Sequence, residues 1–210
     1  LNTLVKDPFG RNREVLRIFA EAGAPEEILY VNKPHIGTDI LIEVIQNLRK
    51  EICALGGEVR FFSQVTDLDI TDGKLTGLTI NNEKKTAADV AVLAIGHSAR
   101  DTFEMLREKP LHMEAKAFAV GVRIEHPQAM IQASQYGANC PYELPAASYK
   151  LTHTAENGRG VYSFCMCPGG YVVNASSEEG RLAVNGMSYH DRDSANANSA
   201  MIVTVTPEDF

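Results

Sequence analysis

The segment that decides the fold runs from Asp89 to Arg100 and reads DVAVLAIGHSAR. Its first seven residues are apolar almost throughout, which is typical of a strand buried on both faces of a sheet. The strand is expected to end at Gly96, and a helix over 99–108 is expected to follow, with capping-box-like spacing of Ser98 and Asp101 at its start. Ligands of open α/β sheets bind beside the carboxyl ends of the strands, so this turn predicts a ligand-binding edge.

Two helices are predicted upstream of this segment. Residues 11–22 place apolar side chains on one helical face and end before Gly23. The second helix begins at Thr38, whose hydroxyl is expected to cap the first turn, and it ends at Gly56-Gly57.

Between the second helix and Asp89, the spacing of apolar residues changes from that typical of a helix to that typical of strands. Strands are predicted over 58–62, 65–71 and 74–80, and Asp72-Gly73 favours the type I′ turn that joins antiparallel strands. The result is a small antiparallel meander that leads into the buried strand.

The remainder of the chain is rich in Gly, Ser and Asn and predicts a second, β-rich part. A strand is expected over 116–125, and an irregular stretch punctuated by prolines follows it. Short strands are expected near 161–167, 170–175, 181–187 and 200–206. We therefore predict an α/β or α+β fold with a domain over 1–114 and a β-rich domain over 115–210.

Composition excludes several function classes. The net charge is −7 and no basic stripe is present, so nucleic acid is not expected as a partner. No apolar run approaches the length of a membrane helix, and the N-terminal residues lack the basic and apolar regions of a signal peptide, so a cytoplasmic protein is expected. The four cysteines lack the paired spacing of a zinc site, so no metal is predicted.

Several side chains are candidates for chemistry. Cys165 and Cys167 are two apart on a predicted strand, so their sulfurs are expected on one face, either as a redox pair or as two buried thiols. His190 and Arg192 belong to a polar cluster in which the Arg192 guanidinium is a candidate to hold an anionic substrate, although such clusters are also common in solvated loops. His35 and His97 are acid–base candidates that are more often structural.

The order of a helix, a meander and a strand that ends in Ala94-Ile95-Gly96 resembles the second half of the FAD-binding domain in glutathione-reductase-type flavoproteins. In that family the residue that matches Val65 contacts the adenine side through its backbone. The turn that matches Ala94-Ile95-Gly96, with His97 beside it, passes close to the cofactor. The resemblance therefore implies a partial FAD-binding domain.

Five motifs are similar to those of an uncharacterised bacterial FAD-dependent dehydrogenase family: LNTLVKDP at 1–8, KPHIGTD at 33–39, AIGHSARD at 94–101, FCMCPGG at 164–170 and VNGMS at 184–188. The resemblance implies that Asn2 and Thr3 run beside the flavin. It also implies that this chain is an internal piece without the family's N-terminal G-x-G-x-x-G and C-terminal segment. Such a piece is expected to be inactive alone and to need the rest of its own FAD-binding domain as a partner.

The function implied is transfer of hydride or electrons between FAD and a small-molecule substrate. Two alternatives remain open from the sequence: a non-catalytic module that binds a ligand or partner, and a flavin-free dithiol redox protein that uses Cys165 and Cys167.

Overall fold

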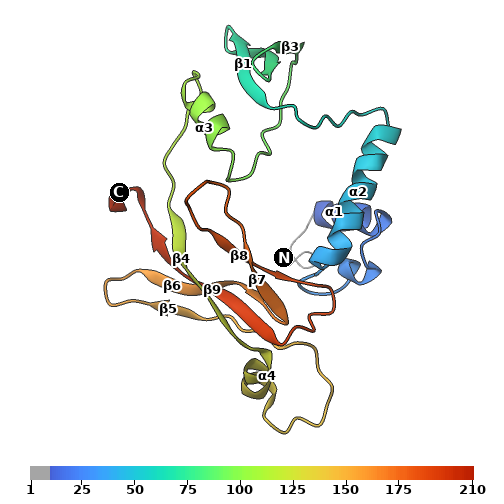
Figure 1. Ribbon diagram of the computed structural model, residues 1–210, viewed down its shortest axis with the longest axis vertical. Coiled ribbons are helices and arrows are strands. Elements are labelled where there is room, and N and C mark those ends of the chain that lie inside the picture. The colour runs from blue at the N-terminus through green and yellow to red at the C-terminus, as the bar shows by residue number, and fades with distance from the viewer. Residues whose placement is uncertain (1–9) are drawn as a thin grey trace. The chain divides into compact units, whose positions relative to one another are not determined.

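A computed structural model describes residues 10–210 (Figure 1). The fold is α+β, as predicted, with antiparallel sheets and short helices. The described chain forms two compact units. The first joins residues up to 57 with 117–210, and the second contains residues 58–116. The predicted domains, 1–114 and 115–210, stay a prediction, because compact units need not coincide with the domains of a natural protein. Within residues 10–210, no helix has the length and hydropathy to cross a bilayer.

The first unit opens with a small helical cluster made of α1 (Arg11–Glu21), the 3-10 helix η1 (Glu26–Leu29) and α2 (Thr38–Ala54). Both predicted helices are confirmed. Ile28 and Val44 are fully buried between these elements and form the centre of their core. The apolar stripes of the two amphipathic helices meet there, which is what stabilises helices of this length.

The predicted cap at Thr38 is wrong. Gly37 takes the N-cap position, so the N-cap residue has no side chain that could bond the first turn. The Thr38 hydroxyl instead donates a hydrogen bond to the carbonyl oxygen of Ser188 at 3.2 Å. A tertiary partner 150 residues away has therefore replaced the local cap.

The second unit contains the predicted meander. It consists of β1 (Val65–Thr71), β2 (Lys74–Ile80) and β3 (Lys84–Ala87), which form one antiparallel sheet in that order. Asp72 and Gly73 have φ values of 50° and 74°, as a type I′ turn requires at both central positions. The strand prediction for 65–71 and 74–80 is confirmed, and β3 is an additional strand.

The predicted strands over 58–62 and 89–95 are wrong. Both segments are extended or bent chain that pairs with no strand among residues 10–210, and Phe62 and Val92 are 99% and 87% exposed. A strand buried on both faces depends on hydrogen-bonded neighbours at its edges and on cover for each face. No described residues supply either to 89–95, so its apolar pattern is not sufficient to make it a strand.

The helix predicted over 99–108 is confirmed as α3 (Arg100–Arg107), but its capping box is wrong. The Ser98 hydroxyl bonds Nδ1 of His97, and the Asp101 carboxylate accepts a hydrogen bond from the amide of Gln64. Each side chain has found a partner other than the helix N-terminus.

The main sheet of the first unit is antiparallel and contains β4 (Phe118–Pro127), β9 (Asn196–Val205), β6 (Gly160–Cys167) and β5 (Thr152–Thr154), side by side in that order (Figure 1). β9 is central, and its residues Ala197, Asn198 and Ser199 are completely buried. The predicted strands at 116–125, 161–167 and 200–206 are confirmed within a few residues, and β5 is an addition.

The strands β7 (Gly170–Asn174) and β8 (Val184–Ser188) form a separate antiparallel pair, also close to the predicted ranges. The helix α4 (Gln128–Tyr136) replaces part of the predicted irregular stretch. Pro127 is the N-cap residue of α4, and its side chain makes no capping hydrogen bond. The first side chain of the helix is buried and bonded to distant backbone, with Gln128 Oε1 accepting from the N–H of Gly169 at 2.8 Å.

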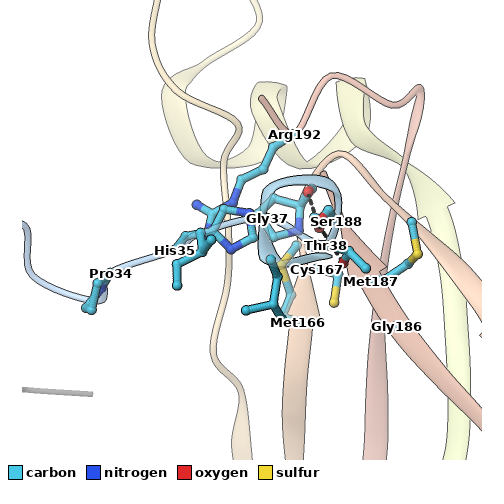
Figure 2. Close-up of a pocket in the computed structure, with 13 residues that line it drawn as sticks. Pro34, His35, Gly37, Thr38, Met166, Cys167, Gly186, Met187, Ser188 and Arg192 are labelled. Carbon is cyan, nitrogen blue, oxygen red and sulfur yellow. Dashed lines mark hydrogen bonds between the residues drawn. The ribbon is translucent and has the colours of Figure 1, made fainter. Parts of the chain in front are cut away.

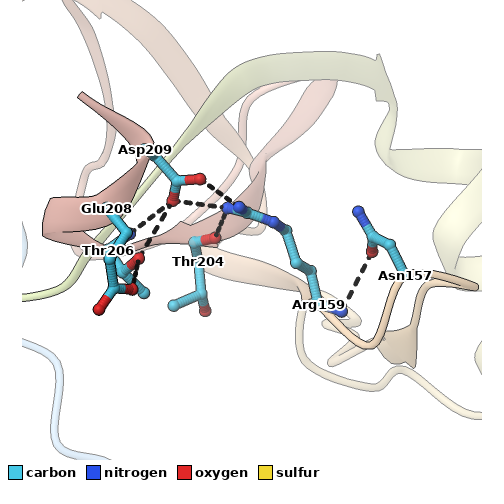
Figure 3. Close-up of polar contacts among 6 residues, drawn as sticks. All are labelled: Asn157, Arg159, Thr204, Thr206, Glu208 and Asp209. Carbon is cyan, nitrogen blue, oxygen red and sulfur yellow. Dashed lines mark hydrogen bonds and ion pairs between the residues drawn. The ribbon is translucent and has the colours of Figure 1, made fainter.

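An ion pair between Arg159 and Asp209 holds the segment after β9 in place (Figure 3). The 3-10 helix η2 (Pro207–Asp209) follows β9, and the guanidinium of Arg159 contacts the Asp209 carboxylate through both terminal nitrogens, one of them at 2.8 Å. The same guanidinium donates to the carbonyl oxygen of Thr204 at 3.0 Å.

Candidate functional site: two pockets that share Arg192

A seam of hydrogen bonds joins the start of α2 to the end of β8. The Asp39 carboxylate accepts from the backbone N–H of His190 at 3.0 Å, and Nδ1 of His190 lies 3.0 Å from the carbonyl oxygen of Ile36. The carbonyl oxygen of Tyr189 lies 3.0 Å from Nε2 of His35. Together with the Thr38–Ser188 contact, these bonds fix the loop before α2 against the segment after β8.

Glycine is required at one point of this seam. Gly37 has φ 93°, and a Cβ on it would lie 2.4 Å from the backbone nitrogen of His190. Side chains essentially never approach backbone that closely, so only glycine allows the two segments to meet.

The seam borders a half-open cavity of about 390 Å³, here called pocket A (Figure 2). Its walls combine apolar side chains, a thiol, backbone and two basic groups. Its lining is Pro34, His35, Ile36, Gly37, Thr38, Leu41, Met166, Cys167, Pro168, Gly186, Met187, Ser188 and Arg192. It is the region around the predicted motifs 33–39, 164–170 and 184–188, which the fold brings together.

A second cavity of about 490 Å³, here called pocket B, shares Pro34, Met166, Pro168 and Arg192 with pocket A. Its other walls come from the loop before α2, from the segment before β5 and from β6. These residues are Asn32, Lys33, Ser148, Tyr149, Lys150, Ser163, Phe164 and Cys165.

A β-bulge in β6 assigns its two cysteines to different pockets. The register of β6 against β9 shifts between Phe164 and Cys167, and Cys165 has φ 46°. The regular alternation assumed for the two sulfurs is therefore interrupted. Cys165 is exposed and lines pocket B, whereas Cys167 is half-buried and lines pocket A.

Two of the half-buried titratable groups of pocket A, Cys167 and His35, are held in their neutral forms. Burial raises the pKa of the Cys167 thiol, although the nearby Arg123 guanidinium acts against this. Burial also lowers the pKa of His35, and the positive charges of Arg192 and His190 add to that effect. The Tyr189 carbonyl and Asp39 favour the protonated ring but do not outweigh the burial.

The fold brings together several of the predicted site residues. Cys167 and Arg192 line pocket A, Cys165 lines pocket B, and His190 supports the seam beside them with its ring stacked on His35. Within the polar cluster at 190–193, His190 and Arg192 are half-buried, whereas Asp191 and Asp193 are exposed. The catalytic assignments of these side chains stay predictions.

The predicted cofactor contacts are placed differently. Val65 begins β1 in the other unit, and Ala94, Ile95, Gly96 and His97 lie in the exposed chain before α3. No sheet in the described part of the chain joins them into one rim. Asn2 and Thr3 lie outside the described residues. All of these cofactor contacts stay predictions.

Sequence reasoning missed Lys33 and Lys150, which line pocket B. An isolated lysine in a polar segment carries no periodic or spacing signal. The one local hint for Lys33 is its place inside the 33–39 motif, directly before Pro34.

One part of the chain is similar to a known protein family. Residues 117–210 match the family described as "FAD-dependent protein, C-terminal domain-like". That range covers β4 to η2 and thus the main sheet, the bulge and Arg192. The whole chain is also 56% identical over 212 residues to an uncharacterized protein of Clostridium beijerinckii. The chain spans 39% of the length of that relative.

The start of α2 does not offer a site for the phosphates of FAD. FAD phosphates are typically held by the free N–H groups at a helix N-terminus after a glycine-rich turn. At the start of α2 the Asp39 carboxylate already occupies this position. Desolvation raises the pKa of that carboxyl, but the backbone N–H groups of His190 and Ile40 outweigh it and keep the pKa below its usual range. A second anion is disfavoured there.

Proposed function

We propose that this chain is part of an FAD-dependent oxidoreductase of the dehydrogenase type, in which residues 117–210 form the side of the protein that receives substrate. The match of these residues to the C-terminal domain of FAD-dependent proteins carries the proposal. Flavin would supply the hydride or electron transfer, and the cofactor phosphates would be held by parts of the natural protein outside the described residues.

The contribution of this chain is a preformed, partly water-shielded surface. Pocket A presents Met166, Pro168 and Met187 as apolar walls beside the Cys167 thiol, and the seam at Gly37 keeps these walls in place. Apolar walls with a few fixed polar groups are typical of small-molecule sites. A glutathione-reductase-type fold and a cytoplasmic location are part of the same proposal.

The test is purification of the natural full-length protein and measurement of bound flavin from its visible absorbance and from FAD released by acid. We expect near-stoichiometric FAD that is bleached by a reductant under anaerobic conditions. Protein that is folded by circular dichroism but contains no flavin, and takes none up from added FAD, would refute the proposal.

A second test concerns pocket A alone. Leu41→Trp enlarges a partly exposed side chain that lines pocket A, so it fills part of the pocket. We expect slower turnover with bound FAD retained. Arg181→Gln, at a well-exposed side chain outside both pockets, is the control and is expected to behave as the wild type.

No specific observation favours the dithiol alternative, which stays a prediction. Cys165 and Cys167 are free thiols that face different pockets, and burial keeps the second one protonated.

A further inference from the structure

Pocket B is cationic in a chain whose net charge is −7. Lys33, Lys150 and Arg192 line it, and its described lining contains no Asp or Glu. Within residues 10–210, none of these three cations forms a salt bridge, although the charge of Glu27 acts on Arg192. Concentration of one sign of charge in a concave site attracts a ligand of the opposite sign.

Arg192 has an unused donor inside this region. Its Nε is buried and has no hydrogen-bond partner among the described residues. A buried N–H of a charged group that lacks a partner costs free energy, and an acceptor that drew the guanidinium into pocket B would recover that cost. The guanidinium fork suits the two oxygens of a carboxylate or phosphate.

The backbone around pocket B is held in rarely populated conformations. Lys33, Cys165 and Arg192 all have positive φ, at 67°, 46° and 53°. In the described chain the other non-glycine residues of this kind are Phe62 and the turn residues Asp72, Asn81 and Asn82. Such backbone strain tends to occur at ligand sites.

We propose that pocket B binds the oxyanion group of a small organic ligand, a carboxylate or a phosphate, with Arg192 as the directed donor and Lys33 and Lys150 as flanking charges. The exposed ring of Phe164 offers the organic part of the ligand an apolar surface. This proposal stands whether or not the natural protein carries FAD, so the two proposals fail independently.

The experiment uses the natural full-length protein as purified, titrated by calorimetry with inorganic phosphate and with benzoate at low and high salt. Binding of phosphate alone identifies a phosphate ligand, binding of benzoate identifies a carboxylate with an apolar body, and either is expected to weaken as salt screens the charges. Failure of both probes to bind at low salt would overturn the proposal.

Variants assign the binding to the pocket. Arg192→Gln is expected to weaken the bound probe by about tenfold or more, as loss of a charge-assisted hydrogen bond does. Lys150→Gln should weaken it less. Arg181→Gln removes the same charge at an exposed position outside the pocket and should leave affinity unchanged. An equal loss of anion affinity in Arg181→Gln would overturn the proposal. Loss of bound flavin together with anion affinity in Arg192→Gln would also overturn it, because that result would assign the cations to the cofactor.

Alkylation gives a readout that does not depend on the stability of an Arg192 variant. Cys165 lines pocket B and Cys53 is exposed on α2. The ratio of the rate with anionic iodoacetate to the rate with neutral iodoacetamide should be several-fold higher at Cys165 than at Cys53, and Lys150→Gln should lower it. Equal ratios at the two cysteines would contradict a cationic pocket.

Discussion

Gly169 and Arg192 touch through their backbones: a Cβ on Gly169 would lie 1.6 Å from the carbonyl oxygen of Arg192. Gly169 also has φ 48°, in the left-handed region that favours glycine. The backbone of the loop that carries Arg192 is therefore packed against the turn between β6 and β7, with no room for any side chain between them.

The first prediction follows from this contact. Gly169→Ala should lower the free energy of unfolding by about 2–4 kcal/mol, because the methyl group forces the two segments apart. Gly158→Ala is the matched control, since Gly158 also has positive φ but no atom lies within 4 Å of its Cβ position. It should cost about 1 kcal/mol, from backbone strain alone. Urea titrations measure both values, and equal losses would contradict the packing argument.

A second prediction concerns pH and His35. Its pKa in the folded protein is lowered, chiefly by burial, so below the ordinary pKa of about 6.5 the unfolded chain takes up a proton that the folded chain resists. The contribution of neutral His35 to the free energy of unfolding is therefore fully present above that pH and is lost as the pH decreases. Denaturant midpoints between pH 7.5 and 5 should show a smaller decrease in His35→Gln, while the matched variant His153→Gln at the exposed β5 should keep the wild-type slope.

Cys167 yields a third prediction. Since burial raises the pKa of its thiol, the reactive thiolate is scarce at neutral pH, and each unit of pKa reduces it about tenfold. Iodoacetamide should therefore modify Cys53 well before Cys167, as followed by peptide mass spectrometry. Arg123→Gln removes the charge that favours the thiolate and should slow Cys167 further. Acceleration in that variant would show that access, rather than ionisation, limits the reaction.

The fourth prediction concerns the ion pair of Figure 3. The Arg159 guanidinium holds the pKa of Asp209 far below its usual range, with help from the N–H of Thr206. This contribution to stability is present above the ordinary carboxyl pKa of about 4 and is lost as the pH falls below it. Asp209→Asn should speed amide exchange at Thr206, whose N–H bonds this carboxylate at 2.7 Å. The control Glu208→Gln removes the same charge without breaking that bond, and an equal effect would contradict the prediction.

Local patterns predicted the elements that depend on local chemistry. The turn at Asp72-Gly73 has the two positive φ angles that its sequence favours, and the stripe of α2 packs as its spacing requires. The misses share one cause. Hydrogen bonds join the side chains of Thr38, Asp101 and Gln128 to partners far away in the sequence, and no local pattern encodes such contacts. The segment 89–95 had the composition of a strand but no neighbour to pair with among the described residues.

The candidate site was predictable in its motifs but not in its geometry. The segments at 33–39, 164–170 and 184–188 were singled out, and they meet at pocket A. The bulge that separates Cys165 from Cys167 leaves no mark in the sequence, because any residue can be forced into such a position by the pairing around it. Lys33 and Lys150 can be recognised as site residues only from the fold, which places them in one pocket with Arg192.

The seam between α2 and β8 has a consequence for biosynthesis, because its hydrogen bonds connect residues 150 to 154 positions apart. A ribosome that adds roughly 5–20 residues per second completes the segment at the start of α2 about 8–30 s before the segment at the end of β8, to which it bonds. Throughout that interval neither cavity exists, and the glycine-bearing loop before α2 is available to chaperones and proteases. Slow translation of the stretch before Ser188 would therefore lengthen the period in which the nascent chain is most vulnerable.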